Sequence, residues 1–104
     1  ATPRPNCAAF GNGVLAATTG SANRVAVGWG SNGGCGPYKG SITARYQDAS
    51  PYTSYPINQA SGTLTDAVPP RCSGTYPVVY ALELQDASGQ SVSASASTKV
   101  VWIC

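Results

Sequence analysis

The clearest pattern in the chain is an alternation of apolar and polar residues between Thr75 and Ile103. It falls into two long segments, and in each of them the apolar residues share one parity. These residues are Tyr76, Val78, Tyr80, Leu82 and Leu84 in the first segment and Val92, Ala94, Ala96, Val100 and Trp102 in the second. Alternation with a period of two predicts strands that are buried on one side and face water on the other. The segment 86–90 between them, with the sequence DASGQ, predicts a hairpin loop.

Shorter segments of the same kind, separated by turn-forming residues, predict further strands earlier in the chain. They are Phe10–Thr19, Arg24–Gly30, Tyr38–Gln47 and Thr63–Val68, with at most a short edge strand inside the Pro- and Tyr-rich stretch Asp48–Ser61. No stretch has the spacing of an amphipathic helix, so the pattern predicts an all-β sandwich or barrel. Its expected core is Val25, Val27, Trp29, Ile42, Tyr46, Leu64, Val68, Tyr76, Val78, Tyr80, Leu82 and Trp102, with Trp29 at the centre.

Length and composition indicate one domain. The chain has 104 residues, 42% of them hydrophobic, which suffices for one modest core. We expect residues 1–6, with Pro3 and Pro5, to form an extended N-terminal arm and residues 7–104 to form a single β-sandwich domain. The start at Ala1, without Met, favours a processed mature N-terminus.

Charged residues are scarce, at 10% of the chain, so hydroxyl and amide groups must keep the surface soluble. The net charge is +2 and the basic residues are scattered along the chain, which argues against nucleic acid as a partner. No apolar run approaches the roughly 20 residues that cross a bilayer, so we expect no membrane span. This composition favours a secreted, extracellular protein.

Four cysteines, Cys7, Cys35, Cys72 and Cys104, predict two disulfides and an oxidising compartment. The alternative is a zinc site made by four thiolates, but such sites usually pair their ligands two to four residues apart. Consecutive cysteines in this chain are separated by roughly thirty residues or more, a spacing that favours disulfides.

Several short motifs occur in the order of the strands of a known family. Val25-x-Val27-x-Trp29, a loop that ends in Gly36-Pro37, and then Ile42 and Tyr46 resemble the B and C strands of fibronectin type III domains. Leu64, Val68-Pro69 and Tyr76-x-Val78-x-Tyr80-x-Leu82 resemble the E strand, the corner after it and the F strand, and the loop 87–91 looks like the one between F and G. The resemblance covers Val14–Trp102. It implies an immunoglobulin-like sandwich of two antiparallel sheets, and it implies no particular chemistry.

The topology of such a sandwich also predicts how the cysteines pair. Because successive strands run antiparallel, their loops alternate between the two ends of the sandwich. Cys7 and Cys35 fall at one end, and Cys72 and Cys104 fall at the other. Bridged Cα atoms lie within about 7 Å, whereas a strand of this length spans roughly 20 Å or more. We therefore expect Cys7–Cys35 and Cys72–Cys104 rather than Cys7–Cys104 and Cys35–Cys72.

The residues that carry most enzyme chemistry are few. The chain has no His, which removes the commonest general base and every nucleophile–histidine arrangement. The acids Asp48, Asp66, Glu83 and Asp86 fall on different elements, and no pair is clearly placed within the roughly 10 Å that two catalytic carboxylates need. We expect no enzymatic activity and no cofactor.

Two of these acids allow a closer prediction. Asp66 shares its parity with Leu64 and Val68, so we expect it at a frayed or edge position. Asp86, with Ser88 two residues later, has oxygens that a calcium ion could use, but ordinary turn chemistry explains the same residues and we expect no metal site.

Three surfaces are candidates for binding. Tyr52, Tyr55 and Asn58 combine flat rings with an amide, a mixture suited to a glycan or a protein, although the tyrosines would equally serve to cover an open sheet edge. Arg71 follows two prolines and precedes Cys72, and this segment resembles the reactive loop of small trypsin inhibitors. A stiff corner with a solvated arginine explains the same residues. The third surface is the outward row Ser91, Ser93, Ser95 and Ser97, where an edge strand could pair with another chain.

We therefore expect a secreted, non-enzymatic module for binding or adhesion to an extracellular protein or glycan. One alternative is a structural subunit that self-associates into an extracellular filament or coat. The other is a small serine protease inhibitor that acts through Pro70-Arg71-Cys72.

Overall fold

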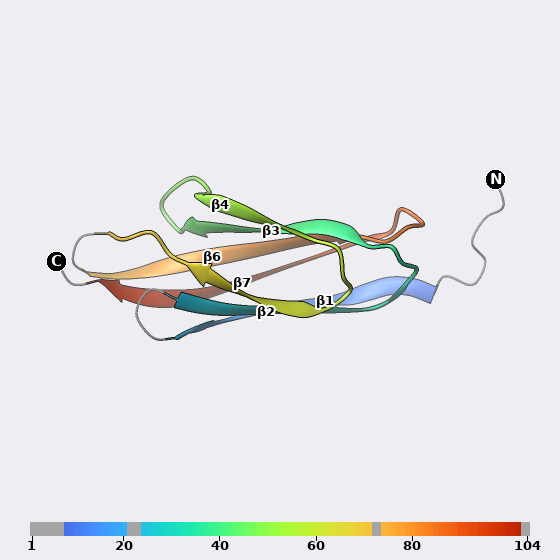
Figure 1. Cartoon of the computed structure of the whole chain (residues 1–104), viewed down its shortest axis with the longest axis horizontal. Helices are drawn as coiled ribbons and strands as arrows, with labels where there is room; N and C mark the ends of the chain where they lie inside the picture. The colour runs from blue at the N-terminus through green and yellow to red at the C-terminus, as the bar shows by residue number, and fades with distance from the viewer. Residues whose placement is uncertain (1–7, 21–23, 72–73, 103–104) are drawn as a thin grey trace.

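The computed structural model describes residues 8–20, 24–71 and 74–102, which consist of strands and their connections. The strands are β1 (Ala8–Thr19), β2 (Arg24–Gly34), β3 (Lys39–Tyr46), β4 (Thr53–Ile57), β5 (Gly62–Ala67), β6 (Gly74–Gln85) and β7 (Ser91–Trp102). They form two antiparallel sheets with the strand orders β1-β2-β5 and β4-β3-β6-β7. Figure 1 shows the two layers running along the length of an elongated molecule, 58 × 22 × 16 Å. The prediction of an all-β fold with two antiparallel sheets is confirmed.

The alternating segments at the C-terminal side form the longest hairpin of the described chain. β6 and β7 pair without interruption from Gly74 opposite Trp102 to Gln85 opposite Ser91. The predicted loop between them turns at Gly89, whose φ of 95° is a conformation that favours glycine. This hairpin supplies the buried side chains that the alternation predicted, and the other strands of both sheets pack against them.

The core between the sheets contains most of the predicted residues. The buried hydrophobic residues are Phe10, Val25, Val27, Ile42, Ala44, Tyr46, Ile57, Val68, Val78, Tyr80, Leu82, Leu84 and Val100. Four predicted core residues, Trp29, Leu64, Tyr76 and Trp102, are only partly buried and pack against this core.

The expected central position of Trp29 was wrong. Its parity with Val25 and Val27 is correct, but the register places it opposite Gly62, at the beginning of the short edge strand β5. The indole fills the space that a side chain at position 62 would take, because a Cβ added there would lie 2.8 Å from the ring. Trp29 therefore lies over the margin of the sandwich, where only part of the ring can be buried.

One long side of the sandwich is closed by contacts between the two sheets. Here β1 runs beside β7, and the Thr19 hydroxyl donates to the Lys99 carbonyl at 2.6 Å and lies 2.7 Å from the Thr98 hydroxyl. Further along, a Cβ added to Gly13 would lie 3.2 Å from the Ser93 carbonyl oxygen. The outer edge of β7 therefore has β1 as its neighbour.

The opposite long side is open. Three strands face four, and since β1 lies against β7, the fourth strand of the larger sheet, β4, has none of the described strands opposite to it. β4 and β5 are the edge strands on this side. The short edge strand expected within Asp48–Ser61 is therefore present as β4, and it overhangs the smaller sheet.

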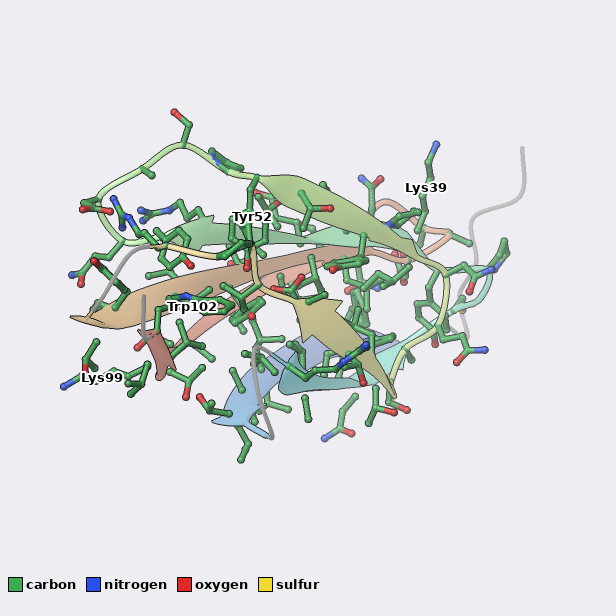
Figure 2. The ribbon with its side chains drawn as sticks, turned by 60° about the vertical axis from the view of Figure 1, so that its left-hand side comes forward. Lys39, Tyr52, Lys99 and Trp102 are labelled. Atoms are coloured by element: carbon green, nitrogen blue, oxygen red, sulfur yellow. The ribbon has the colours of Figure 1, made fainter. Side chains whose placement is uncertain are left out.

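The two ends of the sandwich are marked by Lys39 and Lys99, which project from opposite ends of the molecule in Figure 2. Cys35 lies at the Lys39 end and is disulfide-bonded. Cys7, Cys72 and Cys104 lie outside the described residues, so the predicted pairing stays a prediction. Of the described residues, none belongs to a helix with the length and hydropathy of a membrane span.

Replacing Gly40 should test the register of β3 against β6. A Cβ at position 40 would come within 2.1 Å of the Glu83 carbonyl oxygen, which is main chain and cannot rotate away. We expect Gly40→Ala to lower the free energy of unfolding by about 1–3 kcal/mol, measured by denaturant titration. Gly28→Ala is the matched control, because a Cβ there meets nothing closer than 3.8 Å. Equal stability of the two variants would contradict the register.

Candidate functional site

The four predicted ligand-binding residues do not form one site. Tyr55 and Asn58 line a common cleft on the open side of the sandwich. The hydroxyl of Tyr52 points into the interior, where it binds Asp66. Arg71 lies with Asp48 in a separate cluster. The structure therefore brings two of the four together and gives the others different partners.

The cleft on the open side has a volume of about 350 Å³ and lies between the edges of the two sheets. Its lining residues are Trp29, Tyr55, Pro56, Ile57, Asn58, Gln59, Thr63 and Leu64. It thus combines two aromatic rings and aliphatic groups with two amides and a hydroxyl. None of these residues is charged, so recognition here must use apolar contact and neutral hydrogen bonds.

Two side chains of β2 hold the turn that borders the cleft. The Trp29 indole N–H donates to the Gln59 carbonyl at 3.1 Å, and the Ser31 hydroxyl donates to the Ala60 carbonyl at 2.8 Å. These bonds fix the main chain that follows β4. Among the described residues, the side chains of Asn58, Gln59 and Thr63 have no hydrogen-bond partner, so their polar groups are available to a ligand.

Beside the cleft, Asp66 is completely buried on the edge strand β5, so of the two predicted alternatives the edge position is correct and the frayed one is wrong. Its carboxyl group accepts hydrogen bonds from the hydroxyls of Tyr52 at 2.5 Å and Tyr80 at 2.7 Å, and from that of Tyr55. The parity argument placed Asp66 on the inner face correctly. What makes the inner position tolerable is that the other sheet and its flanking loop supply three phenolic donors.

The same arrangement suppresses ionisation of the three tyrosines. Burial, followed by the hydrogen bond to Asp66 and its negative charge, raises the pKa of Tyr55 to about 12. Burial and the contacts with Asp66 also raise the pKa values of Tyr52 and Tyr80 well above the usual tyrosine range. The phenols stay neutral at physiological pH, so they act as hydrogen-bond donors and not as bases.

Arg71 is held in a cluster of its own. Its guanidinium lies 4.7 Å from the centroid of the Tyr46 ring and 4.8 Å from that of Tyr76. It also donates two hydrogen bonds to Asp48, at 2.8 and 3.1 Å. The hydrogen bond from Arg71 holds the pKa of the Asp48 carboxyl below its usual range. The arginine therefore has three partners within the domain, which are cation–π and ionic contacts.

Asp86 organises the hairpin loop. Its carboxylate accepts hydrogen bonds from the Ser88 hydroxyl and the main-chain N–H groups of Ser88, Gln90 and Cys35, at 2.8 to 3.1 Å. Burial acts to raise the pKa of Asp86, but these hydrogen bonds outweigh it and hold the pKa below the usual range. Turn chemistry therefore explains these oxygens, and within the described ranges no three metal-ligating side chains gather.

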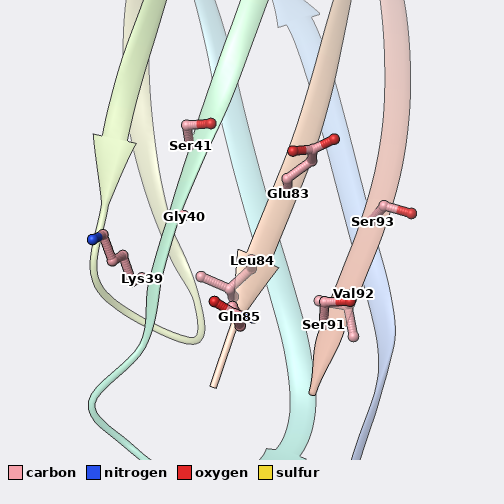
Figure 3. Close-up of a pocket in the computed structure, with 9 residues that line it drawn as sticks. All are labelled: Lys39, Gly40, Ser41, Glu83, Leu84, Gln85, Ser91, Val92 and Ser93. Carbon is pink, nitrogen blue, oxygen red and sulfur yellow. The ribbon is translucent and has the colours of Figure 1, made fainter. Parts of the chain in front are cut away.

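A second hollow, of about 520 Å³, lies on the outer face of β3, β6 and β7 (Figure 3). It is bordered by Lys39, Gly40, Ser41, Glu83, Leu84, Gln85, Ser91, Val92 and Ser93. The close-up shows Lys39 and Glu83 on different strands of this face, and the residues of β7 are serines and a valine. No aromatic ring borders this hollow, so it lacks the flat apolar surface that the cleft offers.

Sequence reasoning missed Trp29 and Thr63 as lining residues. Trp29 was assigned to the core by its parity, and the only signal of its true place was Gly62 at the start of the next paired strand. Comparison with known proteins adds no assignment: no family model, no curated protein and no solved structure matches the chain.

Removing the Asp66 carboxyl should destabilise the domain, because it removes the contacts between the sheets on the open side. Asp66→Ala leaves one buried and two partly buried phenol hydroxyls without their acceptor, and we expect a loss of about 3 kcal/mol or more in the free energy of unfolding. Asp66→Asn keeps one acceptor oxygen and should lose less. The control is Asp48→Ala, at an exposed ion pair, which should change stability little. If Asp48→Ala proved as costly as Asp66→Ala, the cluster would not have the role given to it here.

Stability should also fall at alkaline pH. The unfolded tyrosine ionises near pH 10, whereas the folded values for Tyr52, Tyr55 and Tyr80 are higher. Above pH 10 the unfolded chain has lost protons that the folded chain keeps, so the stabilisation, complete below pH 10, declines as the pH rises towards the folded values. Denaturant midpoints between pH 8 and 12 measure this decline, and Tyr55→Phe should make it shallower. A pH-independent midpoint would contradict the cluster.

Proposed function

We propose that this protein is a secreted, non-enzymatic recognition module, and that its ligand-binding site is the cleft on the open side between β4 and β5. The observation that carries the proposal is the cleft itself. It has two aromatic rings and three polar side chains without partners in the described part of the chain, at a long side of the sandwich that the described strands leave uncovered. Tyrosine and tryptophan give large contact area at low cost in conformational entropy, and amides supply adaptable hydrogen bonds.

The absence of catalysis is part of the proposal, and the positions of the acids support it. Asp66 is locked among tyrosines, Asp48 is paired with Arg71, and Asp86 holds its own loop. Glu83 lies on the outer face, at the other hollow. A general acid–base pair would need two carboxyl groups that face one substrate, and the cleft contains none.

The two alternative functions have less support. A filament that grows by pairing with the outer edge of β7 would have to displace β1, which hydrogen-bonds there through Thr19. A protease inhibitor would have to present Arg71 to the enzyme, and Arg71 would first have to leave Asp48 and the two tyrosine rings. Both remain weaker proposals than recognition at the cleft.

A fibronectin type III-like sandwich remains a proposal about the fold family. In immunoglobulin-like sandwiches, strands B and E share one sheet and strands C, F and G share the other. The segments matched to B and E by their motifs are β2 and β5, which pair with each other. Those matched to C and F, β3 and β6, pair in the second sheet, and β7 pairs with β6. The strand order therefore supports the resemblance.

We also propose the disulfides Cys7–Cys35 and Cys72–Cys104. The Cys35 N–H donates to Asp86, immediately after β6, and the other end of β6 is Gly74, roughly 36 Å away for a strand of this length. Cys72 is two residues from Gly74 and Cys104 is two residues from its partner Trp102, which is too short a reach to bring either to Cys35. Cys7 adjoins Ala8, the partner of Gly34. Non-reducing peptide mapping tests both bridges, and a Cys35–Cys72 peptide would exclude them.

Binding at the cleft can be tested on the oxidised full chain. We expect a ligand among arrays of glycans and purified extracellular proteins, detected by direct binding and confirmed by titration. Asn58→Ala combined with Gln59→Ala should weaken binding roughly tenfold, because each amide contributes about one hydrogen bond. Asn32→Ala, an exposed amide on β2 outside the cleft, is the matched control and should have no effect. If every ligand bound the double variant as tightly as the original chain, the cleft would not be the site.

A further inference from the structure

The open side has a second feature beside the cleft, which is the unpaired edge of β5. Among the described strands, β5 pairs only with β2, in a register that places Val25 opposite Asp66 and Val27 opposite Leu64. In an antiparallel strand, successive residues direct their main-chain N–H and C=O groups to alternate sides. The main-chain groups of one set of β5 residues therefore bond to β2, and those of the other set point away from β2, towards the open side.

One hydrogen bond identifies the outward set. The Gly20 N–H donates to the Arg24 carbonyl at 2.8 Å, so Arg24 and the even residues of β2 face β1. The odd residues of β2, which are opposite Leu64 and Asp66, consequently bond to β5. In the register of the two strands, this leaves Thr63 and Thr65 in the outward set.

Thr63 and Thr65 thus present two N–H and two C=O groups that have no main-chain partner among the described residues. Both residues are exposed. β5 has six residues, so the available edge is short, and it runs along the cleft that Thr63 and Leu64 border.

The smaller sheet has one strand fewer than the larger sheet, so a place for one more strand lies next to this edge. β4 overhangs it with nothing opposite, and neighbouring strands of a sheet lie about 4.8 Å apart. A chain segment that paired with Thr63 and Thr65 would lie beneath β4 and make the smaller sheet four-stranded. Its side chain beside Leu64 would point the same way as Leu64, into the cleft against Trp29 and Ile57.

We propose that β5 binds an extended segment of a partner polypeptide, which adds as a strand next to Thr63 and Thr65 and inserts an apolar side chain into the cleft. This inference rests on the proposed function and names its ligand class. Strand addition supplies affinity through main-chain hydrogen bonds and selectivity through alternate side chains. Because no charged residue lines the cleft, the inserted side chain is expected to be uncharged.

A polypeptide fits this place better than the other occupants. A glycan can stack on Trp29 or Tyr55, but it has no repeating N–H and C=O groups in register with Thr63 and Thr65. The edge strand of a second copy would bring its whole sheet towards the overhanging β4, whereas a single segment brings none. A short, single segment satisfies the backbone groups and the cleft together.

The test uses the oxidised full chain and a phage library of random heptapeptides. Selected peptides are synthesised and titrated, and amide hydrogen exchange is followed with and without peptide. We expect the exchange of the Thr63 and Thr65 amides to slow on binding, because they become donors to the peptide. Thr65→Pro, which removes one outward donor at an edge position, should weaken binding roughly tenfold or more. Thr65→Val keeps the amide and should bind as the original chain does.

Peptide analogues with N-methyl groups provide a readout that does not depend on how a variant folds. Methylation of alternate amides that face β5 should abolish binding, whereas methylation of the others should not. The proposal is overturned if no peptide is selected, if the Thr63 and Thr65 amides remain unprotected, or if the chain dimerises through this edge in light scattering. A glycan that binds the cleft and is lost only with Asn58 and Gln59 would overturn the proposal but leave the proposed function intact. The loss of both kinds of ligand would remove both.

Discussion

The hydrogen bonds between Asp66 and three tyrosines connect the two sheets where no strand does. On the β1–β7 side the sheets approach closely enough for threonine hydroxyls to join them. On the other side β5 stands at the edge of one sheet and β4 at the edge of the other, and the Asp66 carboxyl bridges them through the hydroxyls of Tyr52, Tyr55 and Tyr80. A buried carboxyl without partners would be strongly unfavourable, so the three phenols and the acid depend on one another.

The cleft exists because this bridge is longer than a direct packing contact. Tyrosine is a long side chain, and it joins the edges through its terminal hydroxyl while it keeps the two main chains apart. Tyr55 is therefore both a member of the buried cluster and the end wall of the cleft. Tyr55 therefore contributes both to the contact between the sheets and to the lining of the cleft, so a substitution at Tyr55 would alter both.

Much of the fold could be predicted from the sequence because alternation is a local property. It gave the long β6–β7 hairpin and the inward parity of β2, β3 and β5, while the prolines of the Tyr-rich stretch limited that segment to at most a short edge strand, which is β4. Parity says which side of a strand a residue occupies, but not what lies opposite. That is why Asp66 was placed on the correct face with the wrong environment, and why Trp29 was assigned to the centre when its neighbour is Gly62. The partners of Arg71, which come from β3, β6 and the loop after β3, are equally invisible to a local pattern.

The scarcity of charged residues determines which interactions the open side can use to select a partner. The described acids other than Glu83 are occupied within the domain, and Arg71 is occupied with them, so the molecule offers few charged groups with which to select a partner. Selectivity then has to come from shape and from directional hydrogen bonds, and these are strongest where donors and acceptors are fixed in space. Main-chain groups of a paired strand are fixed in this way, whereas exposed serine hydroxyls on β7 can rotate. The side of the molecule that combines fixed main-chain groups with aromatic surface is the one between β4 and β5, and this combination distinguishes it from the polar outer face.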